Sequence, residues 1–535
     1  MRKIVLYILL LFIVVEKTNA QRVYLPLNNL YGKAVEGALY SNSVLFHTSV
    51  KPCSVKDVNK IINYDSIINT QRLKKEFSVK WKQKAWDKLF NDNVVTFHAK
   101  HFGLFVNPLM EFSFGKDFVD NKKIWVNTRG IEIFGNIEKN ITYYTSFYEN
   151  QAVFTKYVDD WIRKNRVVPG QGVRRNFNNG GFDYSNVTGY LNFNAGKYFV
   201  FQFGHGKNFI GDGYRSLLLS DVSFPNAFLK VVLNVWHIKY MVLYNQYIDI
   251  RSNIPEIGYP RKYSTVHYLS WTISKRVNLS LFDAIVWQAT DTLGNYRGFD
   301  IQYLNPIIFL RPVEFSVGSP DNALIGLNLS VIVGKHNVLY GQAAIDEFTL
   351  HEVLAGNGYW ANKQAFQIGF KTYNPFSING LYFQTEFNYV PPYTYSERIE
   401  RTNYGHYNQP IAHPFGANFW ESVSFVNYNI GRFYLSYEFL YSIKGFDPPG
   451  MNYGGDIYKS YNTRVSDYGN FVGQGIKTKL LYQNLNVSYL INPAYNLNVV
   501  AGMVLRNLDS EGDKEKTQCF YFGLRTSLRN LYYDF

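Results

Sequence analysis

The sequence predicts an all-β protein: an antiparallel transmembrane outer-membrane β-barrel of about 18 strands with a small N-terminal helical segment. Three observations support this fold class. Stretches of alternating apolar and polar residues recur along most of the chain, the gaps between them alternate between short and long, and no run of 18 apolar residues occurs after residue 20. In lipid, only helices and closed barrels satisfy every backbone hydrogen bond. We therefore expect strands to cross the membrane.

Composition narrows the class of protein further. Aromatic residues make up 18% of the 535 residues, charged residues also make up 18%, and there are two cysteines. The mean hydropathy is −0.20, which excludes a bundle of membrane helices. The high aromatic content argues against a disordered chain, and two cysteines are too few for a disulfide scaffold. The formal net charge is +14.

Residues 1–20 have the pattern of a secretory signal peptide. Basic Arg2 and Lys3 precede an apolar run at 4–15, and Ala20 ends the segment before an expected cut at Gln21. The apolar run is shorter than the roughly 20 residues of a membrane helix. An uncleaved anchor is the alternative. Export in this way is consistent with an outer-membrane protein.

Period-two alternation defines eighteen candidate strands. In 377–389, for example, Phe383 and Phe387 share one face, whereas Gln384 and Glu386 share the other. The eighteen predicted strands are 108–117, 123–136, 140–150, 187–196, 198–205, 226–236, 238–250, 263–275, 277–288, 321–334, 337–348, 363–373, 377–389, 417–429, 432–443, 476–490, 494–506 and 517–529.

The gaps between these strands alternate in length. Several contain three residues or fewer, and between them come long gaps at 151–186, 206–225, 289–320, 390–416 and 444–475. Short turns at one end and long loops at the other are typical of outer-membrane barrels. We expect the long loops at the cell surface and both termini in the periplasm. An exported solenoid or propeller is the alternative, but it needs a repeat of fixed period, which the sequence lacks.

The two ends of the mature chain carry further signals. Residues 21–95 are predicted to form a periplasmic helical segment before the barrel at 96–535, because 54–90 has the spacing of basic amphipathic helices. A plug or cap is the preferred role; a helical appendage under the rim and a membrane-surface helix are the alternatives. At the C-terminus, Leu531, Tyr533 and Phe535 occupy alternate positions, as on a strand. A strand that ends in an aromatic residue resembles the signal that barrel-assembly machinery recognises.

Two expectations concern the lumen. Glu386 and Glu438 fall on polar strand faces, so both should point inward, because charge is costly on the lipid side. The loops 206–225 and 289–320 should fold over or into the barrel mouth. Each contains an apolar run, at 217–219 and 306–310, that would form an unfavourable patch on a solvated loop.

The glycine-rich segment 203–216 is the first candidate site. It lacks the Gly-Lys-Ser/Thr of a phosphate-binding loop and the βαβ context of a dinucleotide fingerprint. The side chains expected to point inward are His205, Lys207, Asp212 and Arg215. The segment is then either a ligand-contacting constriction or a loop folded inward for stability alone.

Two long loops supply the second candidate site. Their aromatic and guanidinium groups suit sugars, whose CH faces stack on rings and whose hydroxyls need directional partners. The residues are Trp161, Arg174 and Arg175 in the loop 151–186, and Tyr404, His406 and Tyr407 in the loop 390–416. The basic net charge would also suit acidic glycans or lipopolysaccharide phosphates. The alternative is that such residues are simply common in barrel loops.

Chemistry of other kinds has little support in the sequence. No nucleophile elbow or zinc-binding helix motif occurs, so we expect no catalytic residues, no metal and no cofactor. Nucleic acid is not expected as a partner of an exported barrel, despite the basic charge. Cys53 and Cys519 either form a disulfide between the helical segment and the last strand or stay free.

Several blocks together resemble a known family. They are FGHGKNFIGDGYRSLLLSD (203–221), YLNPIIFLRPVEFSVGSPDNALIGLNL (303–329), YGQAAIDEF (340–348), WANKQAFQIGF (360–370), YGHYNQPIAHPFGANF (404–419) and the terminal YYDF. These blocks resemble the RemB-type gliding-motility proteins of Gram-negative gliding bacteria, within the wider group of Wzi-type capsule-assembly barrels. The resemblance covers most of 100–535. The link to the Wzi group is one of fold and general blocks, so no binding residues carry over.

The resemblance implies an eighteen-stranded outer-membrane barrel with an N-terminal helical part that binds surface polysaccharide without catalysis. The functional expectation is therefore a cell-surface barrel that assists gliding motility or surface attachment by holding a surface polysaccharide or a motility adhesin. A porin-like channel for small solutes is the alternative. The expected partners are outer-membrane lipid and lipopolysaccharide, surface polysaccharide and proteins of the motility machinery.

Overall fold

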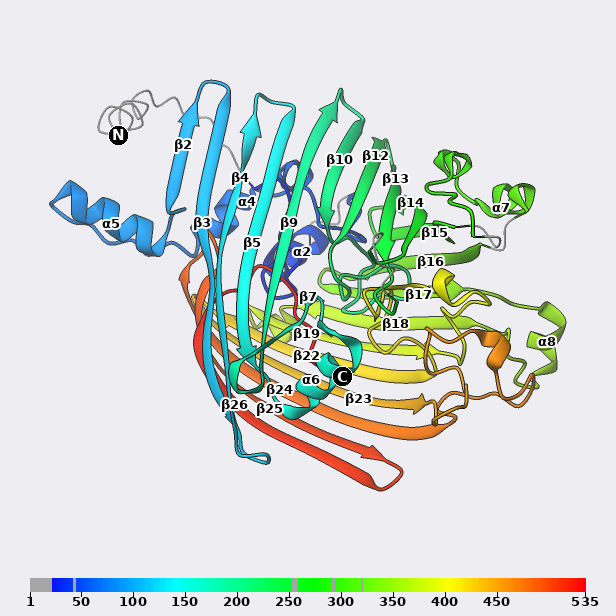
Figure 1. Ribbon diagram of the computed structural model, residues 1–535. Coiled ribbons are helices and arrows are strands. Elements are labelled where there is room, and N and C mark those ends of the chain that lie inside the picture. The colour runs from blue at the N-terminus through cyan, green and yellow to red at the C-terminus, as the bar shows by residue number, and fades with distance from the viewer. Residues whose placement is uncertain (1–21, 42–44, 253–257, 291–293, 319–320) are drawn as a thin grey trace.

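The structure is a computed structural model that describes residues 22–41, 45–252, 258–290, 294–318 and 321–535. The predicted signal peptide lies outside the described residues. Antiparallel strands form one closed barrel, which is completed where the last strand, β26 (Asp513–Thr526), pairs with β3 (Phe102–Asp117). Figure 1 shows this barrel with segments of the chain inside it.

Eighteen strands make the barrel wall, as the sequence predicts. Between β3 and β26 they are β4 (Lys122–Ile137), β5 (Ile141–Val153), β9 (Gly181–Ala195), β10 (Phe199–Gly206), β12 (Asn226–Val235), β13 (Ile238–Ile248), β14 (Arg261–Ser274), β15 (Val277–Gln288), β16 (Asn322–Val333), β17 (Asn337–Ile345), β18 (Gln364–Tyr373), β19 (Leu381–Val390), β22 (Phe419–Ile430), β23 (Phe433–Phe446), β24 (Ile476–Asn492) and β25 (Leu497–Ser510). Each predicted strand corresponds to one of these, and the boundaries differ by at most six residues.

Seven short α-helices and several short strands lie outside the eighteen wall strands in the described part of the chain. The helices are α2 (Lys33–Ser41), α3 (Val55–Asn59), α4 (Tyr64–Asn69), α5 (Lys80–Phe90), α6 (Lys156–Asn165), α7 (Arg311–Val317) and α8 (Leu350–Ala355). Extra strands are β2 (Val95–Ala99), which pairs with β3, and β8 (Arg175–Phe177), which pairs with β9. Two-residue strands pair as β6 (Val167–Val168) with β7 (Gly172–Val173), and β20 (Gly405–His406) with β21 (Gln409–Pro410). Within the described ranges, the helices are all too short or too polar to cross a bilayer.

The two faces of the wall differ as period-two alternation requires. On β19, Gln384, Glu386 and Asn388 are buried inside the barrel, whereas Phe387 between them is exposed outside. Exposed apolar side chains continue around the outer face; examples are Phe114, Phe147, Leu191, Phe201, Leu327, Phe366, Leu435, Val487, Val499 and Phe522. This outer band is the surface that lipid would contact.

Connections at one end of the barrel are mostly short and those at the other mostly long. The short-turn end includes 138–140, 196–198, 236–237 and 275–276, whereas the long-loop end includes 154–180, 207–225, 289–321, 391–418 and 447–475. The predicted alternation of gaps is therefore confirmed. Two tight turns, at 118–121 and 511–512, also lie at the long-loop end.

The N-terminal segment enters the lumen from the short-turn end. Arg22 forms an ion pair with Glu132 on the inner wall, with 2.5 Å between Nη2 and Oε1. The strand β1 (Val50–Lys51) pairs with β11 (Phe209–Ile210) of the loop 207–225, and the Tyr373 hydroxyl of β18 donates to Glu36 of α2 (3.0 Å). The described residues of 22–41 and 45–51 thus act as a plug, a role that the sequence assigned instead to the helices of 54–90; the sequence did not predict α2.

Helix α5 lies at the short-turn rim instead of inside the barrel. Arg432, in the turn between β22 and β23, donates from Nη2 to the Phe90 carbonyl (2.9 Å). Asn492 of β24 donates to the Lys88 carbonyl (3.2 Å). No side chain of α5 is fully buried, and Trp81 and Leu89 are exposed. For α5, the alternative of an appendage under the rim describes the structure better than a plug.

The C-terminal residues leave the sheet and enter the lumen, so the predicted strand-like ending is wrong. Beyond Thr526 no residue belongs to a strand, and the chain end lies inside the barrel (Figure 1). The Tyr157 hydroxyl of α6 donates to the Tyr533 carbonyl (2.9 Å), and the rings of Trp161 and Phe535 lie 5.3 Å apart. The alternating aromatic residues are explained by packing against α6, not by a final strand.

The two loops expected at the barrel mouth take different courses. The loop 207–225 folds into the lumen, where Leu217 and Leu218 are fully buried in the main hydrophobic core with Phe282 of the wall. This prediction is confirmed. The segment 289–320 was predicted to do the same and does not: its described part packs on the outer face of β13–β15. Its Pro306 carbonyl accepts from the outward-facing Tyr240 hydroxyl (2.6 Å). An apolar run can be covered from either side of a sheet, which its composition does not distinguish.

Both cysteines are free. Cys53 lies just after the plug, where its thiol donates to the Val50 carbonyl (3.6 Å), and Cys519 is buried on the inner face of β26. The sequence left open whether Cys53 and Cys519 form a disulfide; in the structure they do not.

Candidate functional site

The loop 207–225 connects the plug to the wall through Asp212. The Asp212 carboxylate accepts from Tyr40 of the plug (3.0 Å) and from Asn328 of β16 (3.1 Å). Lys371 of β18 donates to the Asp212 carbonyl (2.9 Å). Asp212 is buried, and a buried carboxylate is stable only when donors surround it. This residue therefore fixes three parts of the molecule relative to one another.

Arg215, on the same loop, is held between two carboxylates. Its guanidinium donates to Glu421 of β22 (2.9 Å from Nη2) and to Asp534 of the C-terminal tail (2.6 Å from Nη2). His413 of the loop 391–418 is 2.8 Å from Glu421 through Nε2. All four side chains are buried. The planar fork of arginine can serve two carboxylates at once, which a lysine cannot do with the same geometry.

Glu386 of β19 holds the backbone of this loop. Its carboxylate accepts from the amides of Tyr214 (2.8 Å) and Arg215 (3.1 Å), and from the Tyr340 hydroxyl (2.9 Å). A Cβ at Gly213 would lie 2.3 Å from Glu386 Oε2, so this close approach requires glycine. Glu386 and Glu438 both face the lumen, which confirms their predicted orientation.

Two neighbouring cavities, which share several lining residues, lie beside these buried, hydrogen-bonded segments. One of about 310 Å³ lies between the tail, α6 and the inner faces of β3, β4 and β22–β26, and a second of about 410 Å³ lies toward the short-turn end. Both are lined by Leu30, Lys33, Asn427, Arg525 and Ser527. Their size is in the range of small-molecule sites.

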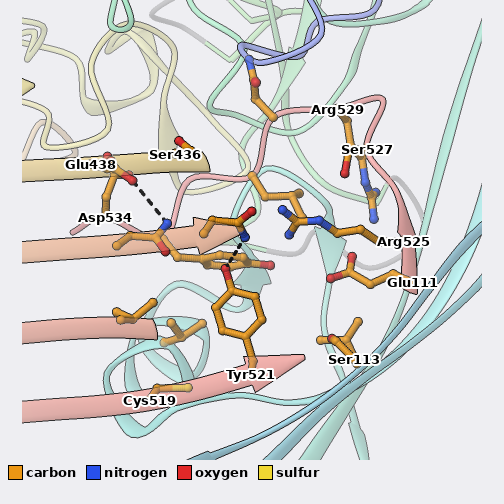
Figure 2. Close-up of a pocket in the computed structure, with 18 of the residues that line it drawn as sticks. Glu111, Ser113, Ser436, Glu438, Cys519, Tyr521, Arg525, Ser527, Arg529 and Asp534 are labelled. Atoms are coloured by element: carbon orange, nitrogen blue, oxygen red, sulfur yellow. Dashed lines mark hydrogen bonds between the residues drawn. The ribbon is translucent and has the colours of Figure 1, made fainter. Parts of the chain in front are cut away.

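The lining of the first cavity is mostly apolar but includes side chains with both signs of charge. Figure 2 shows Arg525, Ser527 and Arg529 on one side, with Glu438 and Asp534 on the other. Dashed lines in the figure mark the bonds from Asn484 to Glu438 (3.5 Å) and from Asn486 to the Tyr521 hydroxyl (2.9 Å). Among the described residues, Arg525 Nε, Arg529 Nη1 and Glu438 Oε1 find no hydrogen-bond partner. These atoms are available to water or to a polar ligand.

The residues predicted on the glycine-rich segment divide into two groups. Lys207, Asp212 and Arg215 point inward as expected, and the Lys207 ammonium donates to the Asp221 carbonyl (2.8 Å). Burial lowers the pKa of Lys207 to about 8, although Asp221 partly offsets this. His205 does not point inward, so that prediction is wrong. It lies on β10, where Gln202 faces the lumen and the odd-numbered residues therefore face outward.

The residues predicted in the long loops are not all accessible. Tyr404 and His406 are each only 1% exposed; the Tyr404 hydroxyl donates to the Leu218 carbonyl (2.7 Å), and His406 Nδ1 accepts from the Ile248 amide (2.9 Å). Their predicted contact with a surface ligand is contradicted by this burial. Arg175 is exposed, Arg174, Trp161 and Tyr407 are partly exposed, and a ligand role for these four stays a prediction.

An aromatic cluster at the long-loop end was not predicted as a site. Trp360 lies 4.6 Å from the Tyr461 ring, Tyr359 lies 5.3 Å from the Tyr468 ring, and the Arg464 guanidinium lies 4.3 Å from the centroid of Trp360. Backbone bonds hold the two loops together, since the Trp360 amide donates to the Asp467 carbonyl (2.9 Å). These rings are at least partly exposed. The two pairs of rings lie about a hundred residues apart in the sequence, so no local sequence pattern predicts the cluster.

Comparisons with known proteins identify the fold. No family model matches the chain, and no curated protein matches it in sequence. Among solved structures, Wzi, "an outer membrane protein involved in group 1 capsule assembly in Escherichia coli" and a carbohydrate-binding β-barrel, is similar over 95% of this chain and 100% of its own, with a TM-score of 0.56 and 11% identity. OprD of Pseudomonas aeruginosa aligns with 82% of this chain and 96% of its own, with a TM-score of 0.43 and 10% identity.

At 11% identity the likeness to Wzi establishes the fold alone: a closed, antiparallel 18-stranded barrel of the outer-membrane type. The likeness to OprD is too distant to support an argument. The resemblance to RemB-type gliding-motility proteins stays a prediction.

Proposed function

We propose that this protein is a non-enzymatic outer-membrane barrel that holds a surface polysaccharide and thereby assists gliding motility or surface attachment. The observation that carries the proposal is that the plug, the loop 207–225 and the C-terminal tail occupy the lumen. Tyr40 and Asp212 join the plug to the loop, and the buried pair of Arg215 and Asp534 joins the loop to the tail. A barrel filled in this way is suited to binding at its surface. The likeness to Wzi, whose own description includes carbohydrate binding, supports the ligand class.

The aromatic cluster of Tyr359, Trp360, Tyr461 and Tyr468 is the best-supported contact surface for that polysaccharide. Sugar CH faces stack on such rings, and Arg464 beside Trp360 can donate to hydroxyl or carboxylate groups of a glycan. The rim residues Arg174 and Arg175 supply additional positive charge. We therefore favour an acidic polysaccharide.

The test measures binding of isolated surface polysaccharide to the purified barrel. Trp360→Ala should weaken binding by about five-fold or more, in line with the loss of one stacking contact of roughly 1 kcal/mol. The matched control is Phe471→Ala, which removes an exposed ring from the same loop region outside the cluster. Equal affinities for wild-type protein and Trp360→Ala would remove the cluster as the site.

Charge is tested separately. Arg174→Ala combined with Arg175→Ala should reduce the salt dependence of binding, because exposed charge contacts are screened within about 8 Å at physiological ionic strength. The stacking contribution should persist at high salt. Binding with an unchanged salt dependence would exclude these arginines from the contact surface.

A porin-like channel is the second candidate function. The two neighbouring cavities favour it, because they leave part of the lumen unfilled. Electrical conductance separates a channel from a closed binding barrel.

A further inference from the structure

One part of the outer wall is covered by the chain itself. On β14 and β15, the outward-facing side chains of Thr265, His267, Asp283, Ile285 and Trp287 are fully buried. Their direction follows from their neighbours. Tyr268 donates to Ser49 of the plug inside the barrel (2.8 Å), so His267 faces outward. The outer flap, defined here as residues 294–318, provides the cover (Figure 1, near α7).

Outward-facing polar side chains of the wall hydrogen-bond to the backbone of the outer flap. Such groups would be unfavourable against lipid, but here five side chains have a partner in the flap. The pairs are Tyr240 Oη to Pro306 O (2.6 Å), Tyr244 Oη to Leu304 O (3.2 Å), Thr265 Oγ1 to Tyr303 O (3.0 Å), Trp287 Nε1 to Gly298 O (3.2 Å) and Leu310 N to Asp283 Oδ2 (2.8 Å). The wall therefore satisfies polar groups of an irregular backbone.

The flap extends far down the barrel wall. Tyr240, which binds the Pro306 carbonyl, is the third residue of β13 counted from its short-turn end. A strand needs about 9–11 residues to cross a bilayer, so the part of the flap near Pro306 lies well below the long-loop rim. Irregular backbone is tolerated at that depth only where its polar groups are satisfied. The five bonds to the wall satisfy some of these groups, and bonds inside the flap, such as Tyr303 N to Asp300 O (3.1 Å), satisfy others.

The outer surface of the flap is mostly apolar, although Gln302 is also exposed and Arg311 is exposed at its end. Its exposed side chains include Ile301 (76%), Leu304, Ile307 (69%) and Phe309. On the neighbouring strands the exposed side chains are also apolar, with Leu229 on β12 and Leu327 and Leu329 on β16. The flap thus continues the lipid-facing band instead of interrupting it. In water, the same residues would form an unfavourable patch.

We infer that the segment 297–310 of the outer flap lies within the hydrocarbon region of the membrane, with Ile301, Ile307 and Phe309 in contact with lipid acyl chains. The inference rests on the membrane location in the proposed function. It assigns the flap as a membrane-immersed second layer of the wall, not a loop in solvent. The flap backbone has its polar partners on the barrel side, and the apolar side chains face the lipid.

Fluorescence quenching tests the depth of the flap. The variant Ile307→Cys is labelled with a bimane maleimide, and wild-type protein, whose cysteines lie within the barrel, is the blank. In vesicles that contain brominated lipid, the probe at 307 should be quenched as strongly as a probe from Phe366→Cys on the outer face of β18. Iodide in the water should quench it little. Leu354→Cys in α8, an exposed apolar position on a loop, is the matched control and should show the opposite pattern.

Each outcome has one meaning. Iodide quenching at 307 equal to that at 354 would overturn the inference and leave the membrane location intact. If neither quencher acts at 307, protein covers the flap, for example a second copy of the chain, and the inference is also overturned. If the probe at 366 also escapes the brominated lipid, the membrane location itself fails.

A second variant tests the hydrogen bonds that hold the flap. Tyr240→Phe combined with Tyr244→Phe keeps both rings and removes the two hydroxyls that pair with flap carbonyls. The unpaired carbonyls would be costly in lipid, so iodide quenching of the probe at 307 should rise at least about two-fold. Tyr143→Phe, which removes an outward-facing hydroxyl remote from the flap, should leave the quenching at 307 unchanged.

Discussion

Arg215 illustrates how a single buried side chain can hold separate segments together. Its guanidinium is fully buried and contacts Glu421 of the wall and Asp534 of the tail. Breaking a buried ion pair by removing one partner is far more costly than losing an exposed pair, because it leaves charge unpaired in a medium of low polarity.

Replacing this arginine should therefore destabilise the barrel strongly. We expect Arg215→Met to lower the free energy of unfolding by about 3–5 kcal/mol, measured by urea unfolding in detergent. Arg175→Met, at an exposed position, should change it by less than about 0.5 kcal/mol. Similar losses in the two variants would mean that the buried pairs contribute no more than surface charge.

His406 should make the stability of the loop 391–418 depend on pH. Burial lowers the pKa of His406 to about 3, and its neutral Nδ1 accepts from the Ile248 amide. An opened loop would take up a proton near pH 6.5 and the closed loop would not. The free energy of opening should therefore fall by about 1.4 kcal/mol per pH unit below 6.5.

Hydrogen exchange measures this opening. The protection factors of the amides around 404–409, which compare intrinsic with observed exchange rates, should decrease as the pH falls from 6.5 to 4.5. In His406→Gln, which keeps an acceptor and cannot titrate, this extra pH dependence should disappear. An identical pH dependence in both proteins would exclude His406 as its cause.

At the residue scale, the sequence predicted the direction of a side chain correctly where the residue lies on a strand with one polar and one apolar face. Glu386 and Glu438 point inward because period-two alternation leaves no other choice. His205 was placed wrongly because it was assigned to the glycine-rich loop, although the predicted strand 198–205 already contains it and strand alternation turns it outward. Burial of Tyr404 and His406 depends on contacts with residues 150–190 positions away, such as Leu218 and Ile248, which no local pattern reveals.

At the scale of elements, the C-terminal tail is a structural part of the lumen. It runs from the end of β26 to α6, where Phe154, Tyr157 and Trp161 surround Tyr533 and Phe535. The tail also supplies Asp534 to Arg215. The helix α6 therefore depends on the tail for part of its packing.

Removal of the tail should loosen α6. A chain that ends at Asn530 should be cut by trypsin in the segment 163–166 at least about ten-fold faster than the full chain, because local opening costs less when buried contacts are lost. The control is Leu354→Ala in α8, an exposed position that should leave this rate unchanged. Equal cleavage rates for the full and shortened chains would show that α6 packs independently of the tail.

The number and order of the wall strands were predictable, their ends only to within six residues, and the loop paths were not. All eighteen wall strands follow from alternation, since every one has a lipid-facing and a lumen-facing side. The helix α2, the inward tail and the outer flap lack such a period. The runs at 217–219 and 306–310 look alike in sequence, yet one packs inside against Phe282 and the other outside against β13–β15. Which side of the wall covers an apolar run depends on the free space there.

On the scale of the whole molecule, three distant parts of the chain share the lumen. The plug binds the loop 207–225 through Tyr40 and Asp212, and the loop binds the tail through Arg215 and Asp534. Two neighbouring cavities lie beside these segments, the first of them along β3, β4 and β22–β26. Whether ions can cross the barrel depends on whether the cavities are continuous to the long-loop end.

We expect the wild-type barrel in a planar bilayer to pass little current, because the plug, loop and tail fill most of the cross-section. Replacing 211–219 by a short Gly-Ser linker removes Asp212, Arg215 and the buried leucines together, and should produce open-channel currents several-fold above the wild-type level. Replacing 350–355 in the same way removes only α8, which has no buried side chain, and should leave the current low. Large steady currents through the wild-type protein would instead favour the porin-like function. In that case the cavity lined by Arg525 and Glu438 would be the permeation path, and Arg525→Glu should change the ion selectivity of the channel.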